Sequence, residues 1–121
     1  GNLVFISGQI SADDNGLITG KLGDTTSLED GAAAARRCGL ALIAQLKAAI
    51  GNLDRVTRVV KLTGFVNSTP DFTDQPKVIN GCSDLMVEVF GEAGRHSRAA
   101  VSAPSLPFGV AVEIEAVFEV R

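Results

Sequence analysis

The chain contains no tryptophan or tyrosine, and only one histidine and two cysteines among its 121 residues. A lone histidine without a close Cys/His cluster leaves almost nothing from which a zinc site could be built, so we expect no metal. Six phenylalanines are the only aromatic residues, and they do not supply a stacking platform for single-stranded nucleic acid. The eleven Lys and Arg residues are scattered and outnumbered by fourteen Asp and Glu, which argues against a nucleic-acid partner in general.

The chain also lacks any apolar run that approaches the roughly 18 residues of a membrane-spanning helix, and it has no signal-peptide pattern. We therefore expect a cytoplasmic protein with no membrane partner. The length of 121 residues suits one domain, residues 1–121, with a core of its own. Because the chain begins with glycine, we expect an N-terminal segment upstream of it.

The few cysteine and histidine residues have simple structural interpretations. Cys38 and Cys82 lie far apart within apolar helical patterns. We interpret them as reduced, small core residues in preference to a disulfide or a reactive thiol. His96 follows Gly94-Arg95 and is interpreted as a solvated loop residue.

The last quarter of the chain, residues 98–120, contains two alternating runs. In the second run one face is wholly apolar and the other carries glutamates, which predicts a strand with one dry side; the apolar row is Val110, Val112, Ile114, Ala116, Phe118 and Val120. Arg98 begins the first run, and Glu113 lies inside the second. This pair could bind a small carboxylate and transfer protons beside it. A structural ion pair or two solvated charges are the alternatives that the residues alone leave open.

The N-terminal residues 3–10 form a β-rich run that contains Ser7-Gly8. Glycine at this point suggests a bulge or a close backbone approach, which would leave the Ser7 hydroxyl near a ligand; a plain strand-end serine is the alternative. The turn signal Asp13-Asp14-Asn15-Gly16 predicts that residues 17–19 return antiparallel to the first strand.

Two helices are predicted. Ser27 caps the first and Gly51 ends it, and an apolar side rich in alanine and glycine allows close approach to a sheet. The second begins after Thr73 or Asp74, with Pro76 in its first turn, and ends at Gly91. Its apolar stripe leaves out Asn80 and Asp84, which are either solvated or face a site; the stripe is Val78, Ile79, Cys82, Leu85, Met86, Val89 and Phe90.

The strand predicted between the helices, within residues 54–67, is partly apolar on both faces and therefore central. One face is expected to carry Val56, Val60, Leu62 and Val66, and the other Val59, Lys61, Thr63 and Phe65. The order is ββαβαββ, which predicts an α+β fold with both helices on one face of a single, mostly antiparallel or mixed sheet. We expect the other face, with Ala111 and Val117, to be covered by oligomerisation.

Several motifs resemble the YjgF-type Rid family, whose members are also called reactive intermediate deaminases or L-PSP endoribonucleases. The residues that carry the resemblance are the run Gly1 to Ile10, the run Val59 to Val66, Asn80, Ser97-Arg98-Ala99-Ala100-Val101, Leu106-Pro107 and Val112-Glu113-Ile114-Glu115-Ala116. The amino-acid sequence of residues 68–72, 78–81 and 91–96 is similar to that of a chorismate-mutase-like subgroup of this family.

The resemblance implies a homotrimer of chorismate-mutase-like (bacillary type) α+β subunits, with ligand clefts between neighbouring chains. It implies that Arg98 clamps a substrate carboxylate and that Glu113 orients or activates a water. Ser7, the backbone amide of Ala100, and Asn80 would complete the contacts. The implied reaction hydrolyses an enamine or imine of the 2-aminoacrylate type to a 2-keto acid and ammonia, without metal or cofactor.

Two positions and one segment differ from the archetypal members. Ala100 stands where those members have cysteine, Ser105 stands where arginine is common, and the aromatic segment that closes the cleft would lie upstream of Gly1. A non-catalytic, small-carboxylate-binding or regulatory trimer of the same family is therefore the alternative function. An endoribonuclease is disfavoured by the acidic composition.

Overall fold

The computed structural model describes residues 2–121, so Gly1, the first residue of the expected N-terminal motif, lies outside the described residues. The main strands are β1 (Leu3–Ile10), β4 (Val56–Asn67), β5 (Ser97–Ala103) and β6 (Val112–Val120). The helices are α1 (Leu28–Ile50) and α2 (Gln75–Phe90), and the short strands β2 (Ala12–Asp13) and β3 (Gly16–Leu17) form a separate ribbon. The short 3-10 helices are Leu53–Arg55, Gly91–Gly94 and Pro107–Gly109.

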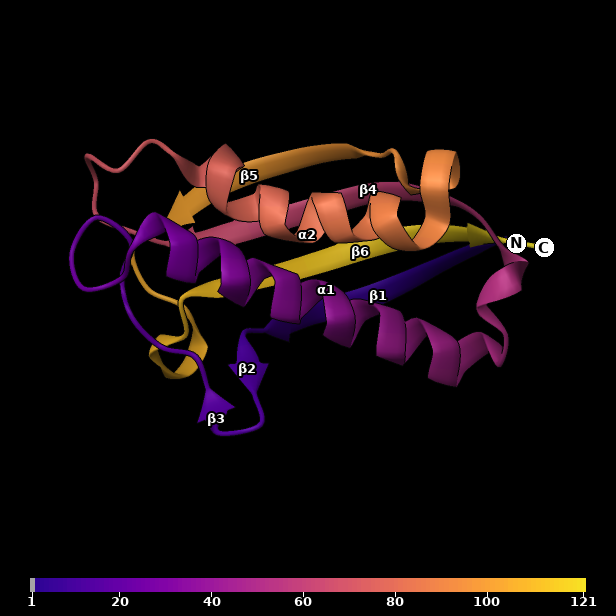
Figure 1. Cartoon of the computed structure of the whole chain (residues 1–121), viewed down its shortest axis with the longest axis horizontal. Coiled ribbons are helices and arrows are strands. Elements are labelled where there is room, and N and C mark those ends of the chain that lie inside the picture. Colours follow the sequence, from indigo (N-terminus) through magenta and orange to yellow (C-terminus); the bar gives the residue numbers. More distant parts are fainter. Residues whose placement is uncertain (1) are drawn as a thin grey trace.

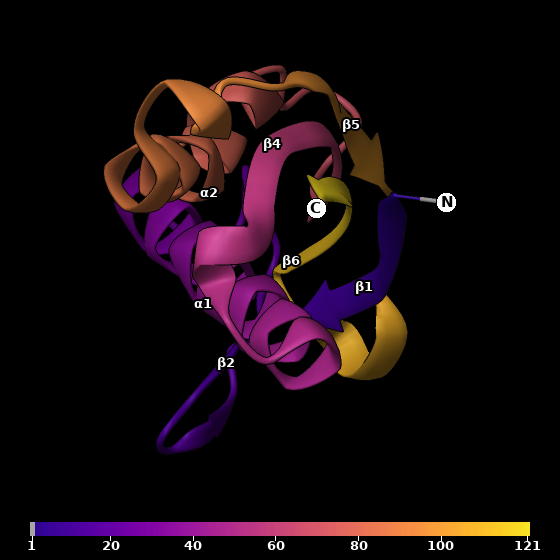
Figure 2. The same ribbon diagram turned by 90° about the vertical axis from the view of Figure 1, so that its right-hand side faces the viewer.

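The sheet has the strand order β1-β6-β4-β5. Strand β6 is antiparallel to both β1 and β4, whereas β4 and β5 are parallel. Helices α1 and α2 lie side by side on one face, and the sheet curves away from them so that its uncovered face is on the inside of the curve (Figures 1 and 2). The predicted α+β fold with two helices on one face of a mixed sheet is confirmed.

The core lies between the helices and the sheet. Every second residue of β6 from Val112 to Val120 is buried there, which confirms the predicted dry side of this strand. The Ser27 side chain accepts a hydrogen bond from the Asp30 backbone N–H, so it caps α1 as expected, and Gly51 ends the helix. Asp74 occupies the N-cap position of α2 but makes no side-chain capping bond. Within residues 2–121, no helix is long and apolar enough to cross a membrane.

The predicted faces of β4 are wrong at Val59, whereas Val56 packs against the core on the side of Leu62, as predicted. Val59 is fully buried in the core opposite Phe118, whereas Lys61 lies opposite Val117 on the uncovered face. Val60 is the extra residue of a β-bulge, and a bulge exchanges the two faces of the strand at that point. Phe65 and Val117 do lie on the uncovered face, but Ala111 is fully buried.

Two further details differ from the predictions. The turn at Gly16 is present, but β3 pairs with β2 and not with the first strand itself. Gly39 and Gly81 lie where α1 approaches α2, and not at the sheet, whereas Gly31 of α1 lies against Leu22. A Cβ added at Gly39 would lie 3.0 Å from Cys82 Sγ, and one added at Gly81 would overlap the backbone carbonyl of Ala32.

Candidate functional site

The predicted site residues Ser7 and Glu113 lie on the uncovered face of the sheet. Strand β1 has a bulge between Ile6 and Gln9, so Ser7 and Gly8 together occupy the space opposite Glu115. This confirms the predicted bulge and leaves Ser7 exposed. Ser7 lines a pocket of about 400 Å³ on this face, together with Phe5, Ile6, Lys61, Thr63, Glu115, Ala116 and Val117.

The Glu113 carboxylate lies against the β1 bulge. Glu113 is paired with Ile10 on one side and Phe65 on the other, and it is partly buried. A Cβ added at Gly8 would overlap Glu113 Oε2 and lie 3.0 Å from its Cδ. The carboxylate can therefore occupy this place only because residue 8 has no side chain. Within residues 2–121, Glu113 forms no salt bridge.

Arg98 lies on the other face of the sheet. Because it pairs with Leu62 in the parallel β4–β5 register, its side chain is directed toward α2. Its Nη1 donates to Ser83 Oγ at 3.1 Å, and its Nη2 donates to the Pro76 carbonyl at 3.3 Å. The guanidinium is partly buried and has no carboxylate partner within the described part of the chain. A structural ion pair with Glu113 within one subunit is thus ruled out.

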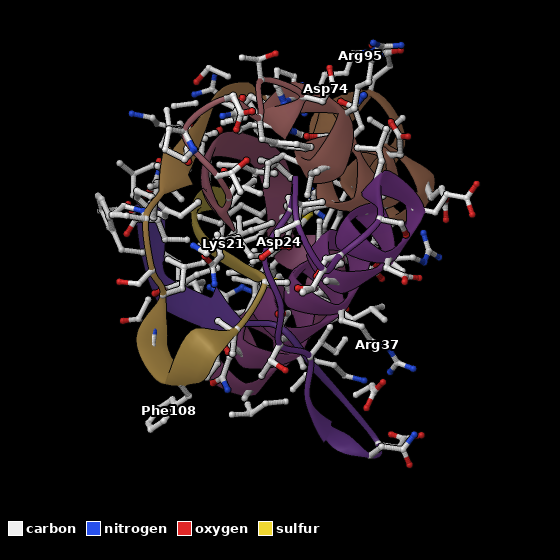
Figure 3. The ribbon with its side chains drawn as sticks, turned by 90° about the vertical axis from the view of Figure 1, so that its left-hand side faces the viewer. Lys21, Asp24, Arg37, Asp74, Arg95 and Phe108 are labelled. Carbon is white, nitrogen blue, oxygen red and sulfur yellow. The ribbon has the colours of Figure 1, made fainter. Side chains whose placement is uncertain are left out.

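A shallow pocket of about 270 Å³ surrounds Arg98 at the edge of the sheet. It is lined by Asn80, Ser83, Asp84, Val87, Arg95, His96 and Arg98. Figure 3 shows the Arg95 side chain extending outward, away from the body of the molecule. The predicted site residue Asn80 therefore does share a pocket with Arg98. Ala100 lies two residues beyond Arg98 on β5, and it packs against the core.

Ser83 and His96 were not among the predicted site residues. Ser83 Oγ and His96 Nε2 are 2.9 Å apart, and His96 Nδ1 lies 2.6 Å from the Gly94 carbonyl oxygen. His96 lies in the loop before β5, as predicted, but it is not a solvated residue, because it is partly buried and its ring is hydrogen-bonded to Ser83 of α2. Ser83 follows Asn80 by three residues, so helical spacing alone places it on the same flank of α2.

The five predicted residues thus form two groups within one subunit. Ser7 and Glu113 lie on the uncovered face at β1 and β6, whereas Arg98, Asn80 and Ala100 lie on the helix side at β5 and α2. Strand β4 separates β5 from β6. One copy of the chain does not bring Arg98 and Glu113 together, so a site that uses both residues requires two copies.

The two cysteines are free and buried in the helix layer, as predicted. Burial raises the pKa of the Cys82 thiol to about 12, against a smaller lowering by the charge of Arg98. Burial also raises the pKa of the Cys38 thiol well above its ordinary value. Both thiols are therefore protonated near neutral pH and unsuited to act as nucleophiles. Among residues 2–121, no three His, Cys, Asp or Glu side chains are grouped so that they could hold a metal ion.

Similar proteins exist among both sequences and structures. Protein TCP17 from Trypanosoma cruzi is 52% identical over 123 residues, which span 100% of this chain and 77% of that protein. The crystal structure of protein Atu1372 from Agrobacterium tumefaciens matches with a TM-score of 0.97 and 45% identity, covering 100% of this chain and 79% of that one. The YjgF gene product from E. coli matches with a TM-score of 0.65 and 27% identity, over 100% of this chain and 83% of that one.

The family described as "YjgF/chorismate mutase-like, putative endoribonuclease" matches residues 1–118. This match spans both groups of predicted site residues, from Ser7 to Glu113. The chain therefore belongs to the YjgF/Rid family.

Proposed function

We propose that this protein is an enamine/imine deaminase that converts reactive 2-imino acids, such as 2-iminopropanoate and 2-iminobutanoate, to 2-keto acids and ammonia. The observation that carries the proposal is the Arg98 guanidinium, which is partly buried, held by α2, and without a carboxylate partner among residues 2–121. A partly buried guanidinium without a counter-ion is suited to bind an anionic ligand. Its planar fork matches a planar carboxylate through two parallel hydrogen bonds, which lysine cannot reproduce.

We further propose that the reaction takes place in clefts between the subunits of a homotrimer. Arg98 and Glu113 project from opposite faces of one sheet, so one subunit would supply Arg98 and Asn80 while its neighbour supplies Glu113 and Ser7. Apolar side chains exposed on the uncovered face support assembly, because such a patch is seldom left in water; Phe5 is 73%, Leu3 49% and Val101 44% exposed.

The chemistry requires only a positioned water, a base and a clamp. Arg98 holds the substrate carboxylate, and Glu113 of the neighbouring subunit takes a proton from a water molecule. As it does so, the water oxygen bonds to the imine carbon and the C=N electron pair moves to nitrogen. The Glu113 carboxyl then returns that proton to nitrogen, which gives a carbinolamine. Glu113 next takes the proton of the carbinolamine hydroxyl and passes it to the amine nitrogen, so that the carbonyl of the 2-keto acid forms as the C–N bond breaks and ammonia leaves. Water is the only co-reactant consumed.

The first test is an assay in which an amino acid oxidase generates 2-iminopropanoate in situ, in the reaction mixture. We expect the protein to accelerate release of the 2-keto acid over spontaneous hydrolysis, measured at several protein concentrations. An absence of acceleration would overturn the deaminase proposal. Calorimetric binding of 2-ketobutyrate that depends on Arg98 would then identify a non-catalytic carboxylate-binding trimer. Light scattering at the same concentrations tests the trimer mass directly.

Gly8→Ala is expected to reduce deaminase kcat by at least about tenfold while the fold is retained. The added methyl group would displace the Glu113 carboxylate, and even a small displacement of a catalytic group slows the reaction. The backbone at Gly8 is not in the left-handed region, so alanine is tolerated there, and only the Glu113 carboxylate must move. A double-mutant cycle checks the cause. In a Glu113→Gln background, Gly8→Ala should have little further effect on kcat, and an additive loss would contradict the assigned contact.

A further inference from the structure

We propose that Ser83 and His96 are positioning residues for Arg98, which they hold in the orientation that receives a ligand carboxylate. The inference rests on Arg98 being the carboxylate clamp of the proposed function. It is carried by a chain of hydrogen bonds that runs from β5 through α2 to the segment between α2 and β5. Ser83 and His96 have no role in the proposed function, which uses Arg98, Glu113, Ser7, Ala100 and Asn80.

The direction of each hydrogen bond in this chain follows from its last member. The Gly94 carbonyl can only accept, so His96 Nδ1, 2.6 Å away, carries the hydrogen. In the neutral ring His96 Nε2 is then an acceptor, and the Ser83 hydroxyl at 2.9 Å donates to it. With its only hydrogen committed in this way, Ser83 Oγ presents a lone pair to Arg98 Nη1 at 3.1 Å.

The same arrangement fixes the plane of the guanidinium. Arg98 Nη2 donates to the Pro76 carbonyl at 3.3 Å, and Nη1 donates to Ser83, two turns further along α2. Two anchors on one helix determine the orientation of a planar group, whereas a single anchor would let it rotate. The guanidinium carries five N–H donors, so those not used by Ser83 and Pro76 stay available to a carboxylate.

The surroundings of Ser83 and His96 favour a positioning role for both residues over direct contact with the reacting atoms. Ser83 is partly buried, and its hydroxyl oxygen is engaged by both Arg98 and His96. The charged side chains that line the same pocket are Asp84 from α2 and Arg95 from the loop before β5. Neither is hydrogen-bonded to Arg98 among the described residues, and Arg95 is paired with Glu92 at 3.3 Å.

The test uses 2-ketobutyrate as a probe of carboxylate binding, together with the steady-state kinetics of 2-iminopropanoate hydrolysis. Loss of one hydrogen bond to a charged group predicts that Ser83→Ala raises the Kd and KM about five- to tenfold, with kcat changed by less than about twofold. His96→Ala should raise both constants about threefold, because the Ser83 hydroxyl is then free to turn. Ser83→Thr keeps the hydroxyl and should restore both constants to within about twofold of wild type.

Ser97→Ala is the matched control, since it removes a hydroxyl beside Arg98 that is bonded to the Val60 carbonyl instead. It should leave the Kd and KM unchanged. An unchanged Kd in Ser83→Ala, an equal rise in Ser97→Ala, or a fall in kcat without a rise in KM would overturn the positioning role. If wild type binds 2-ketobutyrate without turnover and Ser83→Ala weakens that binding, the deaminase proposal fails and the positioning role stands. If wild type neither binds nor turns over, both fail.

Discussion

Refolding an equimolar mixture of Arg98→Ala and Glu113→Gln subunits is expected to recover about a quarter of the wild-type deaminase activity, because in the proposed assembly each cleft is shared by two neighbours in a ring. Each variant alone should lose at least about 100-fold in kcat/KM, since one lacks the proposed carboxylate clamp and the other the proposed general base. Activity of the mixture, measured against each variant refolded by itself, checks the prediction.

The recovery follows from the positions of the two residues in one subunit. Arg98 pairs with Leu62 and faces α2, whereas Glu113 pairs with Phe65 and faces away from both helices. In a mixed ring, a cleft is intact when its Arg98 side comes from a Glu113→Gln subunit and its Glu113 side comes from an Arg98→Ala subunit. Even odds at both places leave about one cleft in four intact, whatever the number of subunits in the ring.

A second mixture separates this arrangement from a site within one subunit. When wild type is refolded with an equal amount of the Arg98→Ala/Glu113→Gln double variant, shared clefts predict that the activity per total chain falls from about half to about a quarter. A site formed by one subunit predicts no recovery in the first mixture and no fall in the second. That pair of results would contradict the shared cleft.

The sequence predicted those parts of the fold in which a local pattern coincides with one-sided burial. Strand β6 is an example, because every second residue from Val112 to Val120 faces the core and a period of two is visible without any tertiary information. The Ser7-Gly8 bulge was also predictable, since glycine marks a place where a side chain is excluded. No glycine marks the bulge at Val60, so the prediction placed Val59 on the wrong face of β4.

The face on which Arg98 lies could not be read from the sequence. The two rows of β5 are Arg98, Ala100 and Ser102 against Ala99, Val101 and Ala103, and neither is clearly dry. Only the parallel register with β4 assigns the arginine row to the helix side. The contacts of His96 likewise depend on how α2 packs beside β5. The spacing of residues within 91–98 does not predict this packing. Tertiary pairing therefore decides which charged side chains can meet within one subunit.

Gly81→Ala is expected to destabilise the protein by about 2 kcal/mol, although alanine is the better helix former. The added methyl would overlap the Ala32 carbonyl oxygen and lie 2.9 Å from its carbon, so the backbones of α1 and α2 must separate. Overpacking of this kind costs about 3 kcal/mol, which exceeds the gain of about 1 kcal/mol in helix propensity. Thermal unfolding at a fixed protein concentration should show a Tm lower by about 8 °C.

Gly39→Ala is the matched control on the facing helix. Its added methyl would lie 2.9 Å from Leu85 Cδ2 and 3.0 Å from Cys82 Sγ, which are atoms at the ends of side chains and not backbone. Because such atoms can shift by a few tenths of an ångström, the gain in helix propensity should offset the crowding, and the change in stability should stay within about 1 kcal/mol. If Gly39→Ala were as destabilising as Gly81→Ala, the crowding of side chains, and not the approach of the two helix backbones, would set the spacing of the helix layer.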